Sequence, residues 1–170
     1  MTIPRELNIK KIGQHYFTTM TPVSTKSLKT SSVVSAGNKI SLQTPSKLDL
    51  NIPDLHTFTM VFSNSSSQVL RIGFDENKNA FFVDRTKAGK SDFDPEFAAI
   101  HYAPRIAKSK RSNLSVILDN SSIELFADGG LTSMTEIFFP DQPFNECHTE
   151  ENSKLFDAIE ISQLKSIWSP

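Results

Sequence analysis

The stretch LDNSSIELFADGGLTSMTEIFFP, from Leu118 to Pro140, constrains the fold more than any other part of the chain. Apolar and polar residues alternate on both sides of Asp128-Gly129-Gly130, where glycine reaches positive φ without a Cβ clash. This pattern predicts consecutive antiparallel strands joined by tight turns. No segment of three turns shows apolar residues at helical spacing, so we expect an all-β chain.

Further alternating runs occur along most of the sequence, separated by clusters of Ser, Asn, Asp and Gly. Many short strands at this spacing predict a β-sandwich or a β-barrel. The predicted strands are Thr57–Phe62, Gln68–Phe74, Ala80–Asp84, Ala98–Tyr102, Leu114–Asp119, Ser122–Ala127, Leu131–Phe139, Lys154–Ile161 and Leu164–Trp168.

Three polar segments are expected to connect these strands. Val23–Ser46 is rich in Ser, Thr and Lys and is predicted to be a long surface connection, with one short strand near Lys39–Leu42. Lys87–Pro95 is predicted to be a polar loop. The basic run KSKR, Lys108–Arg111, is interpreted as a solvated loop rather than a site for a polyanion.

Length and charge limit the classes of partner. A chain of 170 residues with a formal net charge of -1 is expected to form one domain and to bind neither nucleic acid nor an anionic membrane surface. It has no apolar run of the length that a membrane helix needs, so we expect no membrane span. The start, MTIPRELNIKK, has Pro4 and charges where a signal peptide has an apolar core.

The residues that could carry catalysis do not converge in the sequence. There is no Gly-x-Ser-x-Gly motif and no glycine-rich phosphate loop. Cys147 and His148 are adjacent, and neighbours on a strand point to opposite faces, which argues against a Cys-His pair. The other histidines are His15, His56 and His101, without metal-ligand spacing. No metal or other cofactor is expected.

Two carboxylates in the opening stretch, Asp119 and Glu124, lie five residues apart. On a strand over Ser122–Ala127, the odd-numbered positions form an apolar face and Glu124 lies on the opposite, mixed face. Glu124 is therefore expected at a sheet surface or beneath a covering loop, paired with a Lys, Arg or Ser. Asp119 precedes a turn, where Asp accepts a backbone N–H. Glycoside hydrolysis needs two carboxyls about 5 to 10 Å apart around a sugar-sized pocket, which this spacing does not require.

The same stretch resembles the signature of the C-terminal β-sandwich of glycoside hydrolase family 32, which includes invertases, levanases and inulinases. FFVDRTKAGKSDF, from Phe81 to Phe93, resembles the Asp-Arg-x-x-x-Gly segment of that family. MTIPREL resembles its junction between modules, and LKSIW its last strand. The positions that match the signature are Asp119, Ser121, Ser122, Glu124, Phe126, Gly130, Thr135, Phe139 and Pro140.

The resemblance implies a fold: an antiparallel two-sheet β-sandwich with a lectin-like jelly-roll arrangement, formed by residues 1–170 as a single module. It implies that the signature residues are architectural, not catalytic. It also implies a larger parent enzyme with an N-terminal five-bladed propeller. The family's Trp-Met-Asn-Asp-Pro-Asn-Gly-like, Arg-Asp-Pro and Glu-Cys-Pro motifs are missing here, and Glu146-Cys147 lacks the proline. We therefore expect no catalysis by this chain.

Three roles for such a module follow. The first is to pack on the propeller and stabilise an exported fructan-hydrolysing enzyme. The second is to bind fructan, through candidate residues Asp84, Arg85, His101, Tyr102 and Trp168, because sugar sites combine rings with planar polar groups. The third is self-association through a sheet edge or face. Against the second role, Asp84 and Arg85 could form an internal salt bridge, Tyr102 could be a partly buried strand aromatic, and Trp168 could close the core or the propeller interface.

The core is expected to be filled from facing strands, largely by Phe, of which the chain has 13. The predicted core residues are Phe58, Met60, Phe62, Leu70, Ile72, Phe82, Ile117, Ile123, Leu125, Ile137, Ile159 and Ile161.

Overall fold

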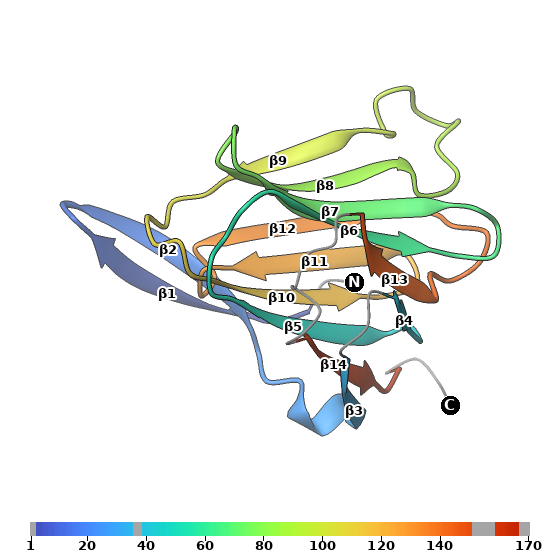
Figure 1. Cartoon of the computed structure of the whole chain (residues 1–170), viewed down its shortest axis with the longest axis horizontal. Helices are drawn as coiled ribbons and strands as arrows, with labels where there is room; N and C mark the ends of the chain where they lie inside the picture. The colour runs from blue at the N-terminus through green and yellow to red at the C-terminus, as the bar shows by residue number, and fades with distance from the viewer. Residues whose placement is uncertain (1–2, 36–38, 151–158, 167–170) are drawn as a thin grey trace.

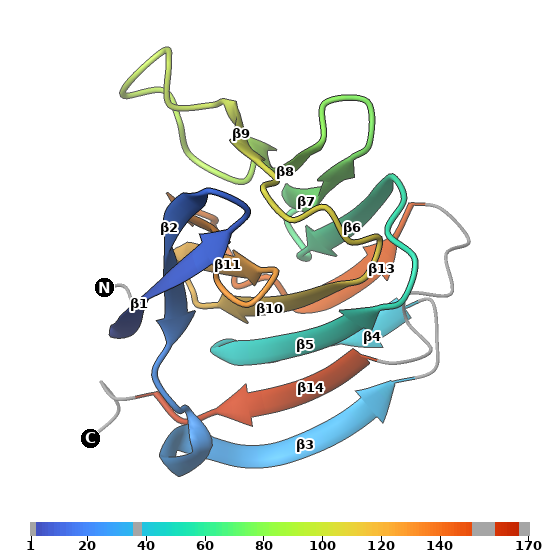
Figure 2. The ribbon, with the colours of Figure 1, turned by 90° about the vertical axis from the view of Figure 1, so that its left-hand side faces the viewer.

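The computed structural model describes residues 3–35, 39–150 and 159–166. Over these residues the chain forms two antiparallel sheets of six strands each, which pack face to face, and a separate two-stranded hairpin (Figures 1 and 2). The expected two-sheet β-sandwich is confirmed. No helix within this part of the chain is long and apolar enough to cross a membrane.

The first sheet, sheet I, has the strand order β12-β11-β10-β5-β14-β3. Its strands are β12 (Thr132–Ile137), β11 (Ser122–Ala127), β10 (Ser112–Leu118), β5 (Ser46–Ile52), β14 (Ile159–Leu164) and β3 (Lys29–Ser35).

The second sheet, sheet II, has the strand order β4-β13-β6-β7-β8-β9. Its strands are β4 (Lys39–Ser41), β13 (Glu146–Thr149), β6 (Phe58–Ser63), β7 (Val69–Asp75), β8 (Ala80–Lys87) and β9 (Ile100–Pro104). The separate hairpin consists of β1 (Arg5–Ile12) and β2 (His15–Pro22), and a short 3-10 helix, η1 (Lys26–Leu28), links it to β3.

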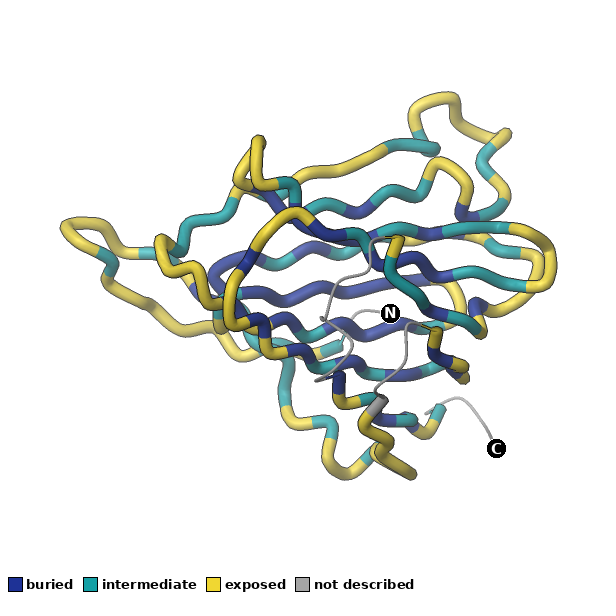
Figure 3. The backbone as a smooth tube through the Cα atoms, in the orientation of Figure 1, coloured by how far each residue is buried: buried dark blue, intermediate teal, exposed yellow. Residues whose placement is uncertain are grey.

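The main core lies between the two sheets, and the strands at the centre of each sheet are the most buried parts of the chain (Figure 3). Alternation along each strand explains this, because every second side chain points between the sheets. Phenylalanine supplies much of the volume. The largest fully buried side chains are Phe58, Phe62, Phe81, Phe138, Phe144, Leu48, Met60, Leu70, Ile72, Leu114 and Leu118.

Most predicted strands are confirmed. Ser122–Ala127 matches β11 end to end, and the other predicted strands before residue 140 match β6, β7, β8, β9, β10 and β12 within a few residues. The alternation of the sequence did not lead us to β1, β2, β5 or β13. Of these, β5 (SKLDLNI) carries a clear alternating signal, with Leu48, Leu50 and Ile52 all buried.

Two predictions about connections and ends are wrong. Val23–Ser46 is not only a connection, because Lys29–Ser35 forms β3, the edge strand of sheet I; an edge strand in water needs no apolar pattern. The short strand near Lys39–Leu42 is confirmed as β4. At the other end, the predicted strands Lys154–Ile161 and Leu164–Trp168 lie partly outside the described residues. Within residues 159–166 a single strand, β14, runs through the break predicted after Ile161.

Three predicted core residues are placed differently. Because Phe81, Phe82 and Val83 are all apolar, the sequence cannot decide which of them face the core. Phe82 faces outward against Tyr102, with ring centroids 6.0 Å apart. Ile137 is 50% exposed. Ile117 is buried, but it belongs to a second apolar cluster on the opposite face of sheet I.

The only cysteine, Cys147, is on β13 and is fully buried in the main core. Burial raises the pKa of its thiol. Because the thiolate is the reactive form, we expect Cys147 in the native chain to react with an aromatic disulfide reagent far more slowly than in denatured chain. Absorbance of the released thiol measures both rates. Rapid stoichiometric labelling of native protein would contradict this placement.

Candidate functional site

The face of sheet I away from the main core is mostly polar, but it carries a small buried apolar cluster. On the face away from the main core, Phe126, Ile117 and Leu164 form the second buried cluster. Partly buried Ile3 and Leu28 pack against it. This cluster is therefore covered by residues from the N-terminal part of the chain. Of the two places expected for Glu124, an open sheet surface or a position beneath a covering segment, the structure shows the second.

Glu124 lies at the centre of this covered face, with its side chain only 4% exposed. Its Oε2 accepts from Arg5 Nη2 at 2.6 Å, and its Oε1 accepts from the backbone N–H of Ile3 at 2.7 Å. Thr135, the cross-strand neighbour of Glu124 on β12, accepts from the same Arg5 nitrogen. The Arg5 guanidinium also lies 5.1 Å from the centroid of the Phe126 ring. Both carboxylate oxygens thus hold the N-terminal segment. We call this set of contacts among Ile3, Arg5, Glu124 and Thr135 the clasp.

A second fastening holds β2 to the turn between β11 and β12. The N–H of Met20 donates to the carbonyl of Gly130 at 2.9 Å. Gly130 has φ +84°, and a Cβ there would lie 2.3 Å from the carbonyl oxygen of Met20. The Asp-Gly-Gly turn therefore needs Gly130 for two reasons, its left-handed backbone and the close approach of β2. The neighbouring Gly129 has open space around its Cβ position.

Beyond these two fastenings the β1–β2 hairpin projects from the sandwich (Figure 1). The pairing register places Leu7 opposite Met20, Ile9 opposite Thr18, and Lys11 opposite Tyr16. Because paired residues share a face, Leu7, Ile9 and Tyr16 lie on the same face of the hairpin. They are 65%, 78% and 69% exposed. Within the described residues neither strand pairs with any other, and isolated two-stranded hairpins are marginally stable in water.

This apolar face continues onto β12. Ile3, Pro4, Arg5, Leu7 and Thr135 line one open depression of about 510 Å³ beside the clasp. Ile137, two residues after Thr135, projects from the same face of β12 and is half exposed.

After β12 the chain meets the loop between β8 and β9, where three rings pack together. Phe139 lies 5.6 Å from Phe97 and 5.7 Å from Phe93, measured between ring centroids. Gly89, at φ +127°, lets this loop approach, because a Cβ there would lie 2.1 Å from the carbonyl oxygen of Phe139. Phe93 and Phe139 remain 55% and 43% exposed. We call the whole exposed apolar strip the docking face; its residues are Leu7, Ile9, Tyr16, Phe93, Ile137 and Phe139.

Beneath the docking face an ionic network joins the two sheets at their edge. Arg85 on β8 lies 3.5 Å from Glu136 on β12, and His101 Nδ1 on β9 lies 2.7 Å from the same carboxylate. Arg85 also donates to the carbonyl of Ile137 at 3.0 Å and packs on the Phe97 ring at 4.1 Å. The side chains of Arg85 and Glu136 are each only 11% exposed. This network supports the residues that carry the docking face.

The residues predicted for sugar binding separate into two groups. Arg85 and His101 meet at Glu136, as just described. Asp84 and Tyr102 lie on the other face of sheet II, since they alternate with those residues along β8 and β9. Asp84 accepts from the backbone N–H of Thr86 at 2.9 Å and forms no ion pair with Arg85. The remaining candidate, Trp168, lies outside the described residues.

The signature residues have structural surroundings. Asp119 accepts from the N–H of Asn120 at 2.8 Å, and the carbonyl of Ser121 accepts from Phe138 at 3.0 Å. Ser122, Glu124 and Phe126 form the covered face of β11. Since Glu124 is buried and both its oxygens are bonded, it is not available to a substrate. Among the described residues, no group of three or more His, Cys, Asp or Glu could hold a metal ion.

Sequence reasoning did not find the hairpin residues of the docking face. The signal was present as Leu7, Ile9 and Tyr16 in a segment otherwise dominated by charged and polar residues. It was too short to distinguish a strand from a polar connection. The partner of Glu124 was expected only by type, and Arg5 lies 119 residues away in the sequence.

Comparisons with known proteins agree with this architecture. A family model described as "Glycosyl hydrolases family 32 C terminal" matches residues 10–166. The extracellular exo-inulinase of Aspergillus awamori is 30% identical over 159 residues, covering 82% of this chain and 29% of the relative. The levanase of Bacillus subtilis (strain 168) is 24% identical over 185 residues, covering 98% and 27%. The chain thus spans less than a third of these relatives.

Solved structures give the same fold. The crystal structure of exo-inulinase from Aspergillus awamori superposes with a TM-score of 0.82 at 24% identity, covering 98% of this chain and 36% of that one. The β-fructofuranosidase from Schwanniomyces occidentalis superposes with a TM-score of 0.70 at 17% identity, covering 97% and 40%.

The clasp makes a prediction about stability. Glu124→Gln should lower the free energy of unfolding by about 2 kcal/mol, because it leaves the Arg5 charge without its carboxylate in a largely buried place. Glu160→Gln is the matched control, since it breaks the more exposed Lys29–Glu160 pair and should cost much less stability than Glu124→Gln. Chemical denaturation measures both. Equal losses would contradict the importance given to the clasp.

The close approach of β2 to Gly130 leads to a second prediction about stability. Gly129→Ala and Gly130→Ala both place a side chain at positive φ, at a cost of about 1 kcal/mol. Gly130→Ala should cost about 2 kcal/mol more, because its Cβ collides with Met20. Thermal or chemical unfolding of the two variants measures the difference, and a pair of indistinguishable values would be inconsistent with the fastening of β2 to this turn.

Proposed function

The chain belongs to the glycosyl hydrolase family 32 C-terminal domain family, and from this premise we propose that it is a non-catalytic module that packs on the catalytic domain of a larger fructan-hydrolysing enzyme and stabilises it. The substrate class rests on the relatives, which are named inulinase and levanase. Their names also support an exported parent, since the inulinase is called extracellular.

The observation that carries the proposal is the docking face. Large apolar side chains gather there on a hairpin that pairs with no other strand in the part of the chain that the structure describes, and on the adjoining end of β12. Contiguous exposed apolar patches mark protein interaction sites. Each such side chain contributes about 1.5 to 3 kcal/mol when fully buried, so a partner that covers several of them gains a stable contact.

The location of the face supports an intramolecular partner. The hairpin begins at Arg5, which the clasp fixes to Glu124. Any chain that precedes residue 3 would enter the module beside the docking face. A domain tethered there has a high effective concentration at this surface, so the contact needs little intrinsic affinity. Without that domain, the docking face would favour self-association.

A second candidate function, fructan binding, is favoured by one observation. Tyr102 presents a ring that is 41% exposed, next to Phe82, with the Lys78 ammonium 3.7 Å from its centroid. A ring with an adjacent hydrogen-bond donor is a common element of sugar sites. Asp84 lies on the same face of sheet II.

Substitutions in the parent enzyme test the docking role. Ile9→Glu should lower the thermal unfolding temperature of the catalytic domain by several degrees, because it places a charge in an apolar contact. Val33→Glu is the matched control, since Val33 is 62% exposed on β3, outside the docking face. In the present chain alone both variants should unfold like the unmodified chain.

Equal stability of the two parent variants would refute packing through this face. Native gel electrophoresis with levan or inulin distinguishes the second candidate: retardation that is lost in Tyr102→Ala would support fructan binding, and unchanged migration would remove it.

A further inference from the structure

The opposite face of the hairpin borders a second depression, of about 400 Å³, that the docking role does not use. Lys10 neighbours Ile9 on β1 and therefore projects away from the docking face. The depression lies between the hairpin, the end of β5, the β9–β10 loop and the turn after β11. Its lining includes Lys10, Asn51, Ser109, Arg111, Ser112, Asn113 and Asp128.

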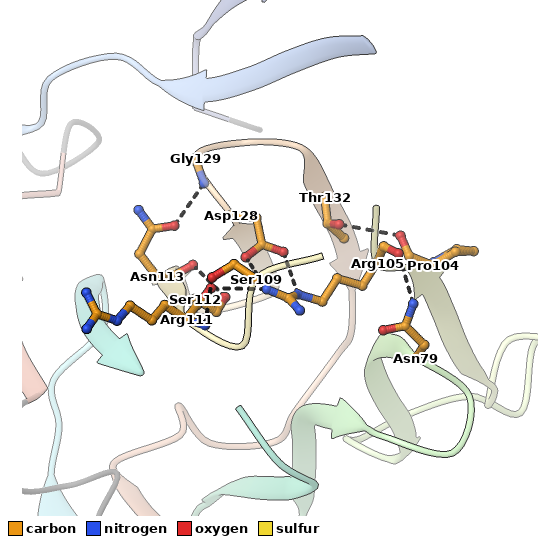
Figure 4. Close-up of polar contacts among 10 residues, drawn as sticks. All are labelled: Asn79, Pro104, Arg105, Ser109, Arg111, Ser112, Asn113, Asp128, Gly129 and Thr132. Carbon is orange, nitrogen blue, oxygen red and sulfur yellow. Dashed lines mark hydrogen bonds and ion pairs between the residues drawn. The ribbon is translucent and has the colours of Figure 1, made fainter. Parts of the chain in front are cut away.

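Asp128, which lines the depression, is held in an ion pair with Arg105 behind it. Arg105 donates from Nε to Asp128 Oδ2 at 2.7 Å and from Nη2 to Oδ1 at 2.9 Å (Figure 4). The two side chains are only 6% and 4% exposed. Arg105 Nη2 also donates to the carbonyl of Arg111 at 3.1 Å, which fixes the backbone of the loop. The Asp128 carboxylate is therefore neutralised by a fixed partner and does not repel an anion as an isolated carboxylate would.

The rim is rich in donors. Asn113 accepts from the Gly129 N–H through Oδ1 at 2.8 Å, which leaves its Nδ2 as a donor. Ser109 Oγ accepts from the N–H of Arg111 at 3.0 Å and keeps its own proton to donate. In Figure 4 the Arg111 guanidinium and Asn113 Nδ2 extend to the same side of the site, neither joined by a dashed line to another residue drawn.

Two full positive charges stand on this rim. Among the described residues, the side chains of Lys10 and Arg111 have no carboxylate partner, whereas the nearby Lys110 lies 3.9 Å from Asp54. Arg111, at the end of the basic run of the β9–β10 loop, thus lines the same depression as Lys10, which comes about a hundred residues earlier in the chain. A solvated loop does not explain this convergence of donors from β1 and the loop around one depression.

We propose that this depression binds an oxyanion group, a phosphate, sulfate or carboxylate carried by a small solute or a saccharide. Arg111 and Lys10 supply the charge, Asn113 and Ser109 supply neutral donors, and the Arg105–Asp128 pair holds the loop in place. The proposal is independent of the docking role, because the two sites lie on opposite faces of the hairpin.

The test is a titration of the 170-residue chain followed by two-dimensional amide NMR, in buffers of equal ionic strength. Inorganic phosphate should shift the amides of Arg111, Asn113 and Gly129 saturably, and fructose 6-phosphate should shift the same amides. Sodium chloride and fructose should not. Arg111→Gln should weaken phosphate binding about tenfold, as should Lys10→Gln, because each removes one charged hydrogen bond. Lys87→Gln, an exposed lysine on β8, is the control and should bind phosphate normally.

Each outcome decides the proposal. Saturable binding of phosphate that both rim variants weaken supports it, and the phosphate and fructose 6-phosphate arms show whether a free ion or a phosphorylated sugar is preferred. The absence of saturable shifts, or equal shifts with chloride, would overturn it. Equal binding of fructose and fructose 6-phosphate would also overturn it, since the site would then recognise neutral hydroxyls. The spectra themselves report whether each variant remains folded.

Discussion

A carboxylate that is buried on a sheet must have partners for both of its oxygens, and this constraint at Glu124 organises the N-terminal part of the molecule. Sheet II covers one face of sheet I, and the segment around Ile3 and Arg5 covers the part of the other face around Glu124 and Phe126. Glu124 is buried at the centre of the second contact and is acceptable there only because Arg5, the Ile3 amide and the adjacent Thr135 surround it. The clasp in turn fixes where the hairpin starts, and the hairpin carries half of the docking face and one side of the oxyanion site.

A buried ion pair is weak evidence for stability, because desolvation of the two charges offsets much of their attraction. Its value here lies in position. An apolar residue in place of Glu124 could cover the sheet in several registers of the N-terminal segment, whereas a carboxylate that bonds one guanidinium and one amide admits a single register. The Arg85–Glu136–His101 network has the same character at the edge of the sandwich, where it ties β8 and β9 to β12.

Local pattern was sufficient where one face of a strand is buried and the other is polar, as in β6 and β7, and the fold class followed from many such strands together. The local pattern failed where the two faces of a strand have side chains of similar polarity. The run Phe81-Phe82-Val83 does not show which residues face the core. The edge strand β3, KTSSVVS, has no alternation of apolar and polar residues. The candidate sites depend on distant segments that come together: Arg5 bonds Glu124, and Lys10 and Arg111 line one depression. No local pattern encodes such pairs, so the docking face and the oxyanion site became visible only in three dimensions.

The strand order of sheet I has a consequence for the sequence of events during synthesis. β14 lies between β5 and β3, so β3 has no place in the sheet until the residues of β14 have left the ribosome. The same holds for the clasp, since Arg5 must wait for β11 and β12. A domain attached before residue 3 would therefore be made, and free to fold, well before its junction with this module can form. Within the module, the central strands can pair before the N-terminal segment and β3 find their partners.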